Sequence, residues 1–231
     1  GPAAAVPLGL READLGTEIL DLHGRERHLL IMGDDASGKT NVLRSVIRRM
    51  MSQHQPRDIV FAVFDPRRSL AGEVPGDSLG GYATSAALAE KLAAAVAGEL
   101  EKRASAAPAE LAGLPRIVLV IDDYDVLTAG GSSPLSRLTP FLPLAPEIGL
   151  HAVLSRRVRG ASRGMYEPFL TALRDSGSAA LILSGDRAEG TLINGVRART
   201  LPPGRAQLIQ PGKPVQVLQL FLNEESSRVP G

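Results

Sequence analysis

Short apolar runs alternate with longer segments of helical periodicity along most of this 231-residue chain. Each run is mostly hydrophobic over five or six residues, which is typical of parallel strands that are covered on both faces. The candidate strands are His28–Met32, Ile59–Phe64, Ile117–Ile121, His151–Ser155 and Ala179–Leu183. Alternation of this kind implies right-handed crossovers between parallel strands. The pattern therefore predicts an α/β fold with a central, mostly parallel sheet flanked by helices.

Between the candidate strands lie segments with a helical pattern. They are Lys39–Met51, Ser85–Arg103, a proline-interrupted segment Leu135–Leu144, and Gly164–Asp175. In the alanine-rich second segment, Leu88, Leu92, Val96 and Leu100 recur on one face. We expect that face to pack on the core.

The two ends of the chain depart from the alternation. Residues 1–24 are irregular, with a short strand or hairpin expected around Glu18 to Leu22, and are interpreted as a lead-in that packs on the core. Near the other end, two β-rich runs flank the turn signal Pro211-Gly212-Lys213-Pro214, which predicts a C-terminal β-hairpin at the edge of the sheet. We assign residues 25–222 to one domain and 223–231 to a flexible tail. Because the chain opens with Gly1-Pro2 and no initiator Met, we interpret it as a piece of a longer protein.

Residues 33–40 are a complete match to G-x-x-x-x-G-K-[ST], the phosphate-binding P-loop, between a predicted strand and a predicted helix. The glycines allow the backbone N–H groups to wrap around phosphates, Lys39 supplies a positive charge, and the Thr40 hydroxyl can hold Mg²⁺. The sequence therefore predicts binding of a nucleoside triphosphate, ATP or its product ADP, with Mg²⁺. The predicted nucleotide contacts are Gly33, Asp34, Asp35, Ala36, Ser37, Gly38, Lys39, Thr40 and Asn41.

A second part of the site is expected at the end of the strand Ile117–Ile121, where Asp122 and Asp123 follow. Parallel strands place ligands at their carboxyl ends, so Asp122 is predicted beside the P-loop as a Mg²⁺ carboxylate that acts through water or through Thr40. Asp123 is the candidate catalytic base. Many P-loop motors with an extra strand between the two motifs carry Glu at that position. Because Asp123 is one methylene shorter, we expect slow or negligible hydrolysis. Asp125 is a weaker candidate, and a solvated loop acid is the simpler interpretation of it.

Basic residues gather after the fourth candidate strand. Three interpretations are open for Arg156, Arg157, Arg159 and Arg163: an arginine finger that reaches a neighbouring subunit, a patch that tracks DNA phosphates, or a solvated loop. His151 is interpreted as structural, because no second histidine or carboxylate stands at ligand spacing.

Composition narrows the functional classes. The chain has 26 basic and 25 acidic residues, so no global field favours DNA or an anionic membrane. Cysteine is absent, which excludes a disulfide framework and thiolate metal sites. No apolar stretch is long enough for a membrane-spanning helix, and no secretory signal pattern opens the chain, so we expect this piece to be soluble.

Several motifs together resemble the FtsK/SpoIIIE branch of RecA-like P-loop NTPases, and more narrowly the EccC ATPases of type VII (ESX) secretion. Besides the P-loop, the resemblance rests on the segments 61–68, 118–125, 149–154, 183–186 and 203–208. The Asp122-Asp123-Tyr124-Asp125 and Ser184-Gly185-Asp186 segments point to the C-terminal, third ATPase domain of that family.

The resemblance implies a module of a longer, multi-domain protein that belongs to a secretion complex at the cytoplasmic face of the inner membrane. Its partners would be other ATPase domains of the same protein, in an assembly such as a hexamer, and the C-terminal export signal of small helical-hairpin substrates. Later modules of the family are considered degenerate. Asp123 in place of Glu, and Arg156-Arg157 in place of a Thr-Gln sensor pair, agree with that.

Two alternatives remain open: a fully active motor completed by an arginine finger in trans, and a DNA translocase of the FtsK type. The near-neutral charge and the scarcity of aromatic residues argue against the translocase. The sequence does not locate the substrate pocket. Exposed apolar residues are expected either in Ala71–Tyr82 or in Leu135–Pro146, although core packing explains them equally well. It also leaves open which ESX system is involved and which residues contact adenine.

Overall fold

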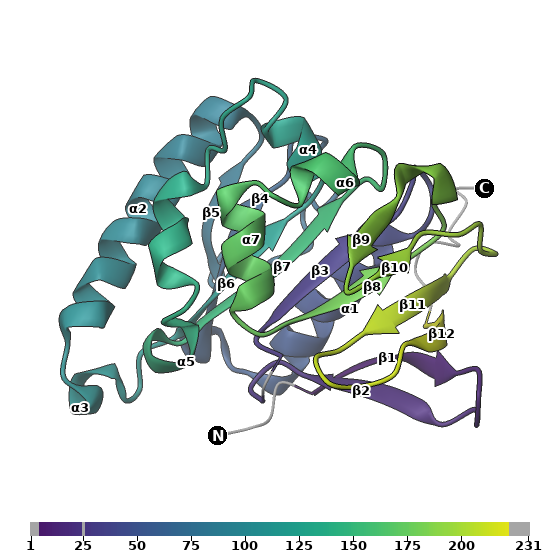
Figure 1. Ribbon diagram of the computed structural model, residues 1–231. Helices are drawn as coiled ribbons and strands as arrows, with labels where there is room; N and C mark the ends of the chain where they lie inside the picture. Colours follow the sequence, from purple (N-terminus) through teal and green to yellow (C-terminus); the bar gives the residue numbers. More distant parts are fainter. Residues whose placement is uncertain (1–4, 25, 222–231) are drawn as a thin grey trace, which may run out of the picture.

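The computed structural model describes residues 5–24 and 26–221, so the predicted tail 223–231 lies outside it. Within these ranges, ten strands form one sheet in the order β2-β1-β12-β11-β8-β3-β7-β6-β4-β5 (Figure 1). The six strands from β8 to β5 are parallel, and the pairs from β8 outward to β2 are antiparallel. The predicted mostly parallel α/β sheet is therefore confirmed.

The parallel strands include every strand predicted from the apolar runs and one that the pattern did not predict. Their bounds are β3 His28–Met32, β4 Ile59–Phe64, β5 Leu79–Ala83, β6 Arg116–Ile121, β7 Leu150–Arg156 and β8 Ser178–Ile182. The unpredicted strand is β5, whose Gly80-Gly81 pair is atypical of a strand. A Cβ on Gly81 would lie 2.3 Å from Cδ1 of Leu92, so a larger residue there would require the Leu92 side chain of the helix above to move.

The C-terminal hairpin is present, but its predicted position at the sheet edge was wrong. Its strands β11 Arg205–Ile209 and β12 Gln216–Leu220 lie inside the sheet, and β12 pairs with β1 Ala5–Arg11. Strand β2 Thr17–Asp21 then forms the outer edge. The hydrophobic pattern of a strand does not show whether the strand lies at the edge or in the interior of a sheet. The position of β12 therefore became clear only from its pairing with the N-terminal hairpin β1–β2.

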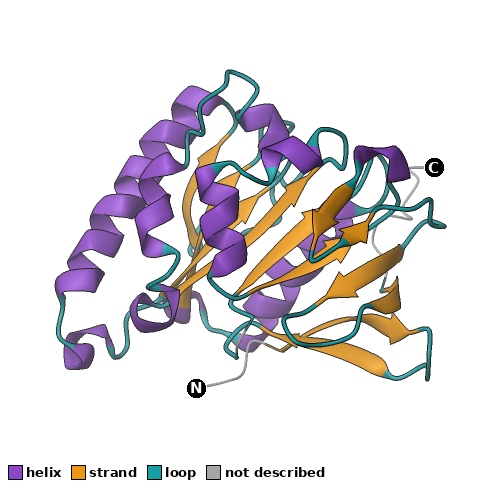
Figure 2. Ribbon diagram, viewed as in Figure 1, coloured by secondary structure: helices purple, strands orange, loops and turns teal. Residues whose placement is uncertain are grey.

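Helices cover both faces of the sheet (Figure 2). Helix α1 lies on one face, and α2, α5 and α7 lie on the other (Figure 1). The bounds of the helices are α1 Lys39–Gln53, α2 Ala86–Ser105, α3 Pro108–Leu111, α4 Tyr124–Leu127, α5 Ala145–Ile148, α6 Ala161–Gly164 and α7 Pro168–Asp175. Short 3₁₀ turns are η1 Pro56–Asp58, η2 Ser136–Phe141 and η3 Arg187–Glu189, and a small separate hairpin is formed by β9 Thr191–Ile193 and β10 Val196–Arg197.

Alternate residues of the central strands supply two separate cores, because successive side chains of a strand point to opposite faces. In β3, Leu30 and Met32 face the core under α2 and α7, whereas Leu29 and Ile31 face the core under α1. All four side chains are fully buried. Among the described residues, no helix combines the length and the apolar character needed to cross a bilayer.

Of the four residues predicted on the buried face of α2, Leu92, Val96 and Leu100 pack on the core as expected, and Leu88 does not. The helix buries Ala89, Ala93, Ala97 and Leu100 completely or nearly so, while Leu88 is 44% exposed. Alanines four residues apart let the helix axis come close to the sheet, so small side chains occupy the contact and larger ones flank it.

Proline residues explain two further differences between the predicted and the observed helices. The helix predicted at Gly164–Asp175 begins only at Pro168, as α7, while α6 ends at Gly164; Pro168 has no N–H to continue a helix and instead begins one. The segment Leu135–Leu144 is a 3₁₀ turn with Pro140 inside it rather than an α-helix.

Candidate functional site

The P-loop connects β3 to α1 and is anchored to the strands on either side. The Gly33 N–H donates to the Arg156 carbonyl at the end of β7 (3.3 Å), and the Asp34 N–H donates to the Ser184 carbonyl after β8 (2.8 Å). Two residues of the loop have left-handed backbone, Ala36 with φ 58° and Gly38 with φ 108°. The turn that brings successive N–H groups to one side is therefore built into the fold.

Side chains of the loop complete a cradle that suits a polyphosphate. Lys39 is 6% exposed and its Nζ donates to the Asp34 carbonyl across the loop (3.0 Å). The Ser37 hydroxyl is buried and has no hydrogen-bond partner in the described part of the chain. A Cβ on Gly33 would lie 2.3 Å from Ser37 Oγ, so only glycine fits there. A buried cation beside an unsatisfied hydroxyl favours an anionic ligand.

Asp122 joins the P-loop through Thr40. The Thr40 hydroxyl donates to Asp122 Oδ2 (2.9 Å), and the second carboxylate oxygen accepts from the Ser155 hydroxyl and from the Asp123 N–H (3.1 Å). Asp122 is 1% exposed. Ser155 was not predicted, because a serine near the end of a buried strand has a function here only through the pairing of β7 beside β6. The carboxylate and the hydroxyl are hard oxygen ligands of the kind that Mg²⁺ prefers.

Asp123 is held by its neighbours rather than free. Its backbone is left-handed (φ 47°), which is a strained conformation for a residue with a side chain. Its Oδ2 lies 2.9 Å from Arg67 Nε. Burial and the nearby Asp122 raise the pKa of the Asp123 carboxyl, while Lys39 and Arg67 act in the opposite direction.

Arg67 reaches Asp123 from a loop that is fixed by a buried acid, Asp65. The Asp65 carboxylate is fully buried and accepts from the N–H groups of Ser69 (3.0 Å) and Leu70 (2.7 Å) and from the Tyr82 hydroxyl (2.6 Å). This Asp65-Pro66-Arg67-Arg68 segment carries part of the family resemblance, but its sequence alone predicts no part in the site. Only the order of the sheet, with β4 beside β6, brings it there.

Of the four arginines around the end of β7, Arg156 is buried and the Arg157 side chain is 30% exposed. Arg156 is 5% exposed, its Nε donates to the Arg157 carbonyl (3.1 Å), and burial lowers the pKa of its guanidinium. Arg157 Nε lies 3.1 Å from Asp35 Oδ1 of the P-loop. Arg159 and Arg163 are exposed.

The interpretation of Asp125 as a solvated loop acid was wrong. Its Oδ1 accepts from the Arg157 N–H (3.0 Å), and its side chain is 22% exposed. Asn41, the last predicted nucleotide contact, donates from its amide to the Phe221 carbonyl (3.4 Å). His151 is structural, as predicted: it is fully buried, and burial lowers its pKa to about 3.

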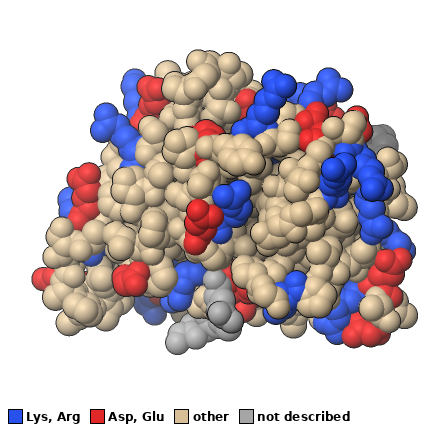
Figure 3. All heavy atoms as spheres, in the orientation of Figure 1, with Lys and Arg blue, Asp and Glu red and all other residues tan. Residues whose placement is uncertain are grey.

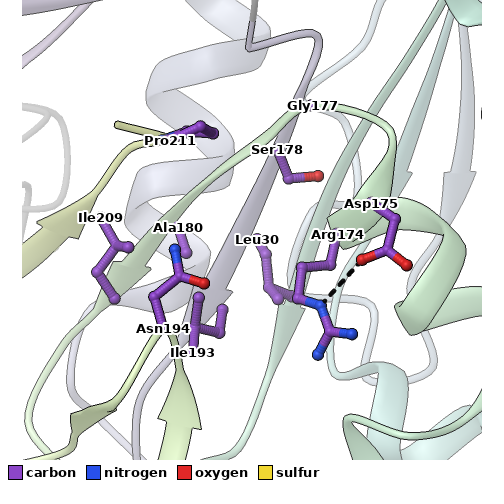
Figure 4. A pocket seen from close by; sticks show the side chains of 10 residues that line it. All are labelled: Leu30, Arg174, Asp175, Gly177, Ser178, Ala180, Ile193, Asn194, Ile209 and Pro211. Atoms are coloured by element: carbon purple, nitrogen blue, oxygen red, sulfur yellow. Dashed lines mark hydrogen bonds and ion pairs between the residues drawn. The ribbon is translucent and has the colours of Figure 1, made fainter. Parts of the chain in front are cut away.

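The two segments suspected of carrying exposed apolar residues are mostly packed into the core, with one exception. Val74 is buried in the first, Leu135, Leu138 and Leu142 are fully buried in the second, and Leu144 of the second is 41% exposed, as expected. A cavity of about 340 Å³ lies elsewhere, between α7 and the β9–β10 hairpin (Figure 4). Its floor is apolar, with Leu30, Ala180 and Ile209, and its rim carries polar groups that include Arg174 and Asn194. Within the described residues, no group of three or more His, Cys, Asp or Glu side chains could hold a metal ion.

The chain is similar to known proteins over nearly all of its length. The model of the FtsK/SpoIIIE family matches residues 8–106. The chain is 36% identical over 226 residues to the ESX-4 secretion system protein EccC4 of Mycobacterium tuberculosis, covering 94% of this chain and 18% of that protein. It therefore spans less than a fifth of that relative.

Two solved structures have the same fold over nearly all of the chain. One is the cytoplasmic domain of the Thermomonospora curvata type VII secretion ATPase EccC, and the other is ATPases 2 and 3 of that protein in complex with a signal sequence peptide. Each superposes with a TM-score of 0.88 at 29% identity and covers 96% of this chain, which corresponds to 26% of the first structure and 41% of the second.

Proposed function

The chain is a domain of the FtsK/SpoIIIE type and a homologue of the EccC proteins of ESX secretion systems, and on this premise we propose that it binds ATP with Mg²⁺ in the cradle of residues 33–40. The observation that carries the proposal is the 2.9 Å contact between Thr40 and Asp122, beside the buried Lys39. These segments are 82 residues apart in sequence, and together they supply the cation, the hydroxyl and the carboxylate that a Mg²⁺-bound phosphate needs.

Thr40 would hold the Mg²⁺ by its hydroxyl, with Asp122 acting through water or through Thr40. When bound, the ion neutralises charge on the phosphate oxygens. The Ser155 hydroxyl and the Asp123 N–H fix the orientation of the Asp122 carboxylate, so that it stays aimed at Thr40.

Titration of the chain with ATP, with Mg²⁺ and then with EDTA, tests this part of the site. We expect Mg²⁺ to strengthen ATP binding in the wild type, and Asp122→Asn to remove most of that gain. An equal gain from Mg²⁺ in the variant would show that Asp122 has no part in holding the ion.

We also propose that the isolated chain hydrolyses ATP slowly or not at all. A general base must be ionised and free to accept a proton. The Asp123 carboxylate is instead paired with Arg67 at 2.9 Å, and its strained backbone fixes the direction of a side chain that is already one methylene shorter than Glu. A neighbouring ATPase domain could complete the site with an arginine. Turnover that appears only in the full-length assembly would favour this active-motor alternative.

The role proposed for the module is control of the secretion motor and recognition of the C-terminal export signal of a substrate. It is supported by the structural relative that was solved with a signal sequence peptide. The cavity in Figure 4 is our candidate for the peptide site, because an apolar floor with a few polar groups at the rim is typical of ligand sites. In the cell, the chain would then act as part of a longer, membrane-anchored protein with other ATPase domains as partners.

A fluorescent peptide with the C-terminal signal of a small helical-hairpin substrate tests that role. We expect saturable binding to the wild type and loss of binding in Ile193→Asp, which places a charge in the cavity wall. Leu114→Asp, at a position 43% exposed and outside this cavity, is the control. Unchanged peptide affinity in Ile193→Asp would move the site elsewhere.

DNA is disfavoured as a partner. Acidic and basic side chains are interspersed over much of the face in Figure 3, with a group of basic side chains near β9, β10 and β11. Basic and acidic residues nearly balance, at 26 and 25, which gives a weak global field for a polyanion.

A further inference from the structure

A second cavity, with a polar lining, lies at the end of the sheet opposite the P-loop. Its volume is about 260 Å³, and it is lined by the end of α2, the loop 111–114, the first residue of β6 and the end of α5 (Figure 1). Strands β6 and β7 run parallel, so their first residues lie away from Asp122 and the nucleotide site. The cavity shares no lining residue with the one in Figure 4.

The guanidinium of Arg103 forms one wall of this cavity and is held firmly by the fold. Its side chain is only 4% exposed. Its Nη1 donates to the carbonyls of Pro115 (2.8 Å) and Ile148 (3.2 Å), and its Nε donates to Glu99 Oε1 (3.2 Å). None of the described residues accepts a hydrogen bond from the remaining nitrogen, Nη2. Arg103 therefore keeps one donor for a ligand in the cavity.

The second cation of the cavity, Arg116, has no acid beside it. In the part of the chain that the structure describes, no residue forms an ion pair or a hydrogen bond with its guanidinium. Burial, followed by the charge of Arg27, lowers the pKa of this group. The charge of Arg116 in turn lowers the pKa values of His23 and His151. A half-buried cation with only cationic or neutral neighbours is unfavourable, and a bound anion would relieve it.

The acid that lines the cavity does not neutralise these two arginines. Glu147 lies on α5 and is exposed, and no ion pair joins it to Arg103 or Arg116. Two guanidiniums therefore line the same space with a single, solvated carboxylate at its rim. Guanidinium groups match the paired oxygens of phosphates and carboxylates, so the lining suits a ligand with such a group.

We propose that this cavity is a binding site for an oxyanion, a phosphate or a carboxylate group, which lies between the guanidiniums of Arg103 and Arg116. Arg103 supplies a fixed donor, and Arg116 supplies a charge that the described residues leave without a partner. The inference goes beyond the proposed nucleotide and peptide sites and does not depend on either of them.

Titration of the chain with inorganic phosphate, and separately with acetate, tests the proposal by amide NMR. The signals of Gly113 and Gly149, which line the cavity, are the readout. We expect both signals to shift saturably in the wild type with at least one of the two anions. Tighter binding of phosphate would identify the ligand as a phosphorylated molecule, and tighter binding of acetate would identify it as a carboxylate.

Three variants separate a specific site from a general attraction of anions. We expect Arg116→Gln to weaken binding by about tenfold or more, because a charge-assisted contact is lost. Arg116→Lys keeps the charge without the planar fork and should give a smaller loss. Arg137→Gln, at an exposed arginine of η2 outside the cavity, is the matched control and should leave the affinity unchanged.

Two results would overturn the proposal. One is the lack of a saturable shift of Gly113 and Gly149 with either anion, and the other is equal affinity of the wild type and Arg116→Gln. Shifts confined to the P-loop glycines Gly33 and Gly38 would place the anion in the nucleotide site, which contradicts this inference and leaves the proposed function intact. Urea unfolding of each variant distinguishes a lost contact from a lost fold.

Discussion

The chemistry of the site depends on Asp123, whose carboxylate is strongly constrained. It is paired with Arg67, its backbone is left-handed, and its N–H donates to the Asp122 carboxylate and to the Ser155 hydroxyl. These contacts make Asp123 a part of the scaffold that orients Asp122. A role as scaffold and a role as base predict different results when the side chain is removed.

We predict that Asp123→Ala leaves the slow ATP turnover of the isolated chain within about twofold of the wild type, because a paired carboxylate contributes little as a base. Phosphate release at saturating ATP is the measurement. A drop of about a hundredfold, the size expected when a true general base is lost, would contradict the prediction. Lys39→Ala serves as the control that removes all specific turnover.

At the residue scale, motif spacing was sufficient to predict that Thr40 and Asp122 lie together, because each has a fixed place relative to a strand end. It did not predict that Ser155 and Arg67 lie beside them. Both enter the site through the neighbours of β6, which are β7 on one side and β4 on the other. Pairings between distant strands leave no local signal in a single sequence.

At the element scale, α2 shows where a hydrophobic pattern misleads. The centre of its contact with the core is a row of alanines ending at Leu100, Leu92 and Val96 flank that row, and Leu88 is 44% exposed. A hydrophobic pattern places the large leucines at the centre of the contact. Close packing of the helix on the sheet instead requires small residues there. The predicted start of the helix Gly164–Asp175 was wrong for a different reason: Pro168 begins the observed helix four residues later.

Two substitutions test which residues of α2 lie at its contact with the core. Ala93 is fully buried, so Ala93→Leu should lower the free energy of unfolding by about 1–3 kcal/mol through overpacking. Leu88→Ala, at a position that is 44% exposed, should change it by less than about 0.5 kcal/mol. Urea unfolding followed by circular dichroism measures both. A larger cost for Leu88→Ala than for Ala93→Leu would show that Leu88 packs on the core after all.

At the scale of the whole molecule, hairpins from both ends of the chain complete one ten-stranded sheet within the described residues. The parallel centre was predictable because buried strands have continuous apolar runs. For the antiparallel part, the sequence predicted the C-terminal hairpin but not the order in which its strands and those of the N-terminal hairpin lie in the sheet. Histidines gather near the end of the sheet opposite the P-loop: the His23 ring stacks on His151 at 5.4 Å, and His28 begins β3.

These buried histidines predict acid sensitivity. Burial lowers the pKa of His28 to about 4 and that of His151 to about 3; the charge of Arg27 adds to the shift of His28, and that of Arg116 to the shift of His151. Each folded pKa lies below the ordinary value of about 6.5, so this contribution to stability is complete above pH about 6.5 and is lost as the pH falls toward about 4. Two fully buried histidines give a slope of up to about 3 kcal/mol per pH unit in that window.

Urea unfolding at a series of pH values between about 7 and 4.5 measures this slope. We expect His151→Phe to reduce it by about a third to a half, because this buried group no longer binds a proton on unfolding, whereas His28 and the half-buried His23, whose pKa is also lowered to about 4, still do. An unchanged slope in the variant would place the acid sensitivity elsewhere in the molecule.

The central claim is that the loop from Gly33 to Thr40 grips a polyphosphate, and isothermal titration of the chain with ATP and Mg²⁺ tests it most directly. The account predicts a single saturable site in the wild type and a loss of affinity of about a hundredfold or more in Lys39→Ala, because the buried ammonium is the main cation of the cradle. Equal affinity of the wild type and of this variant for ATP would contradict it.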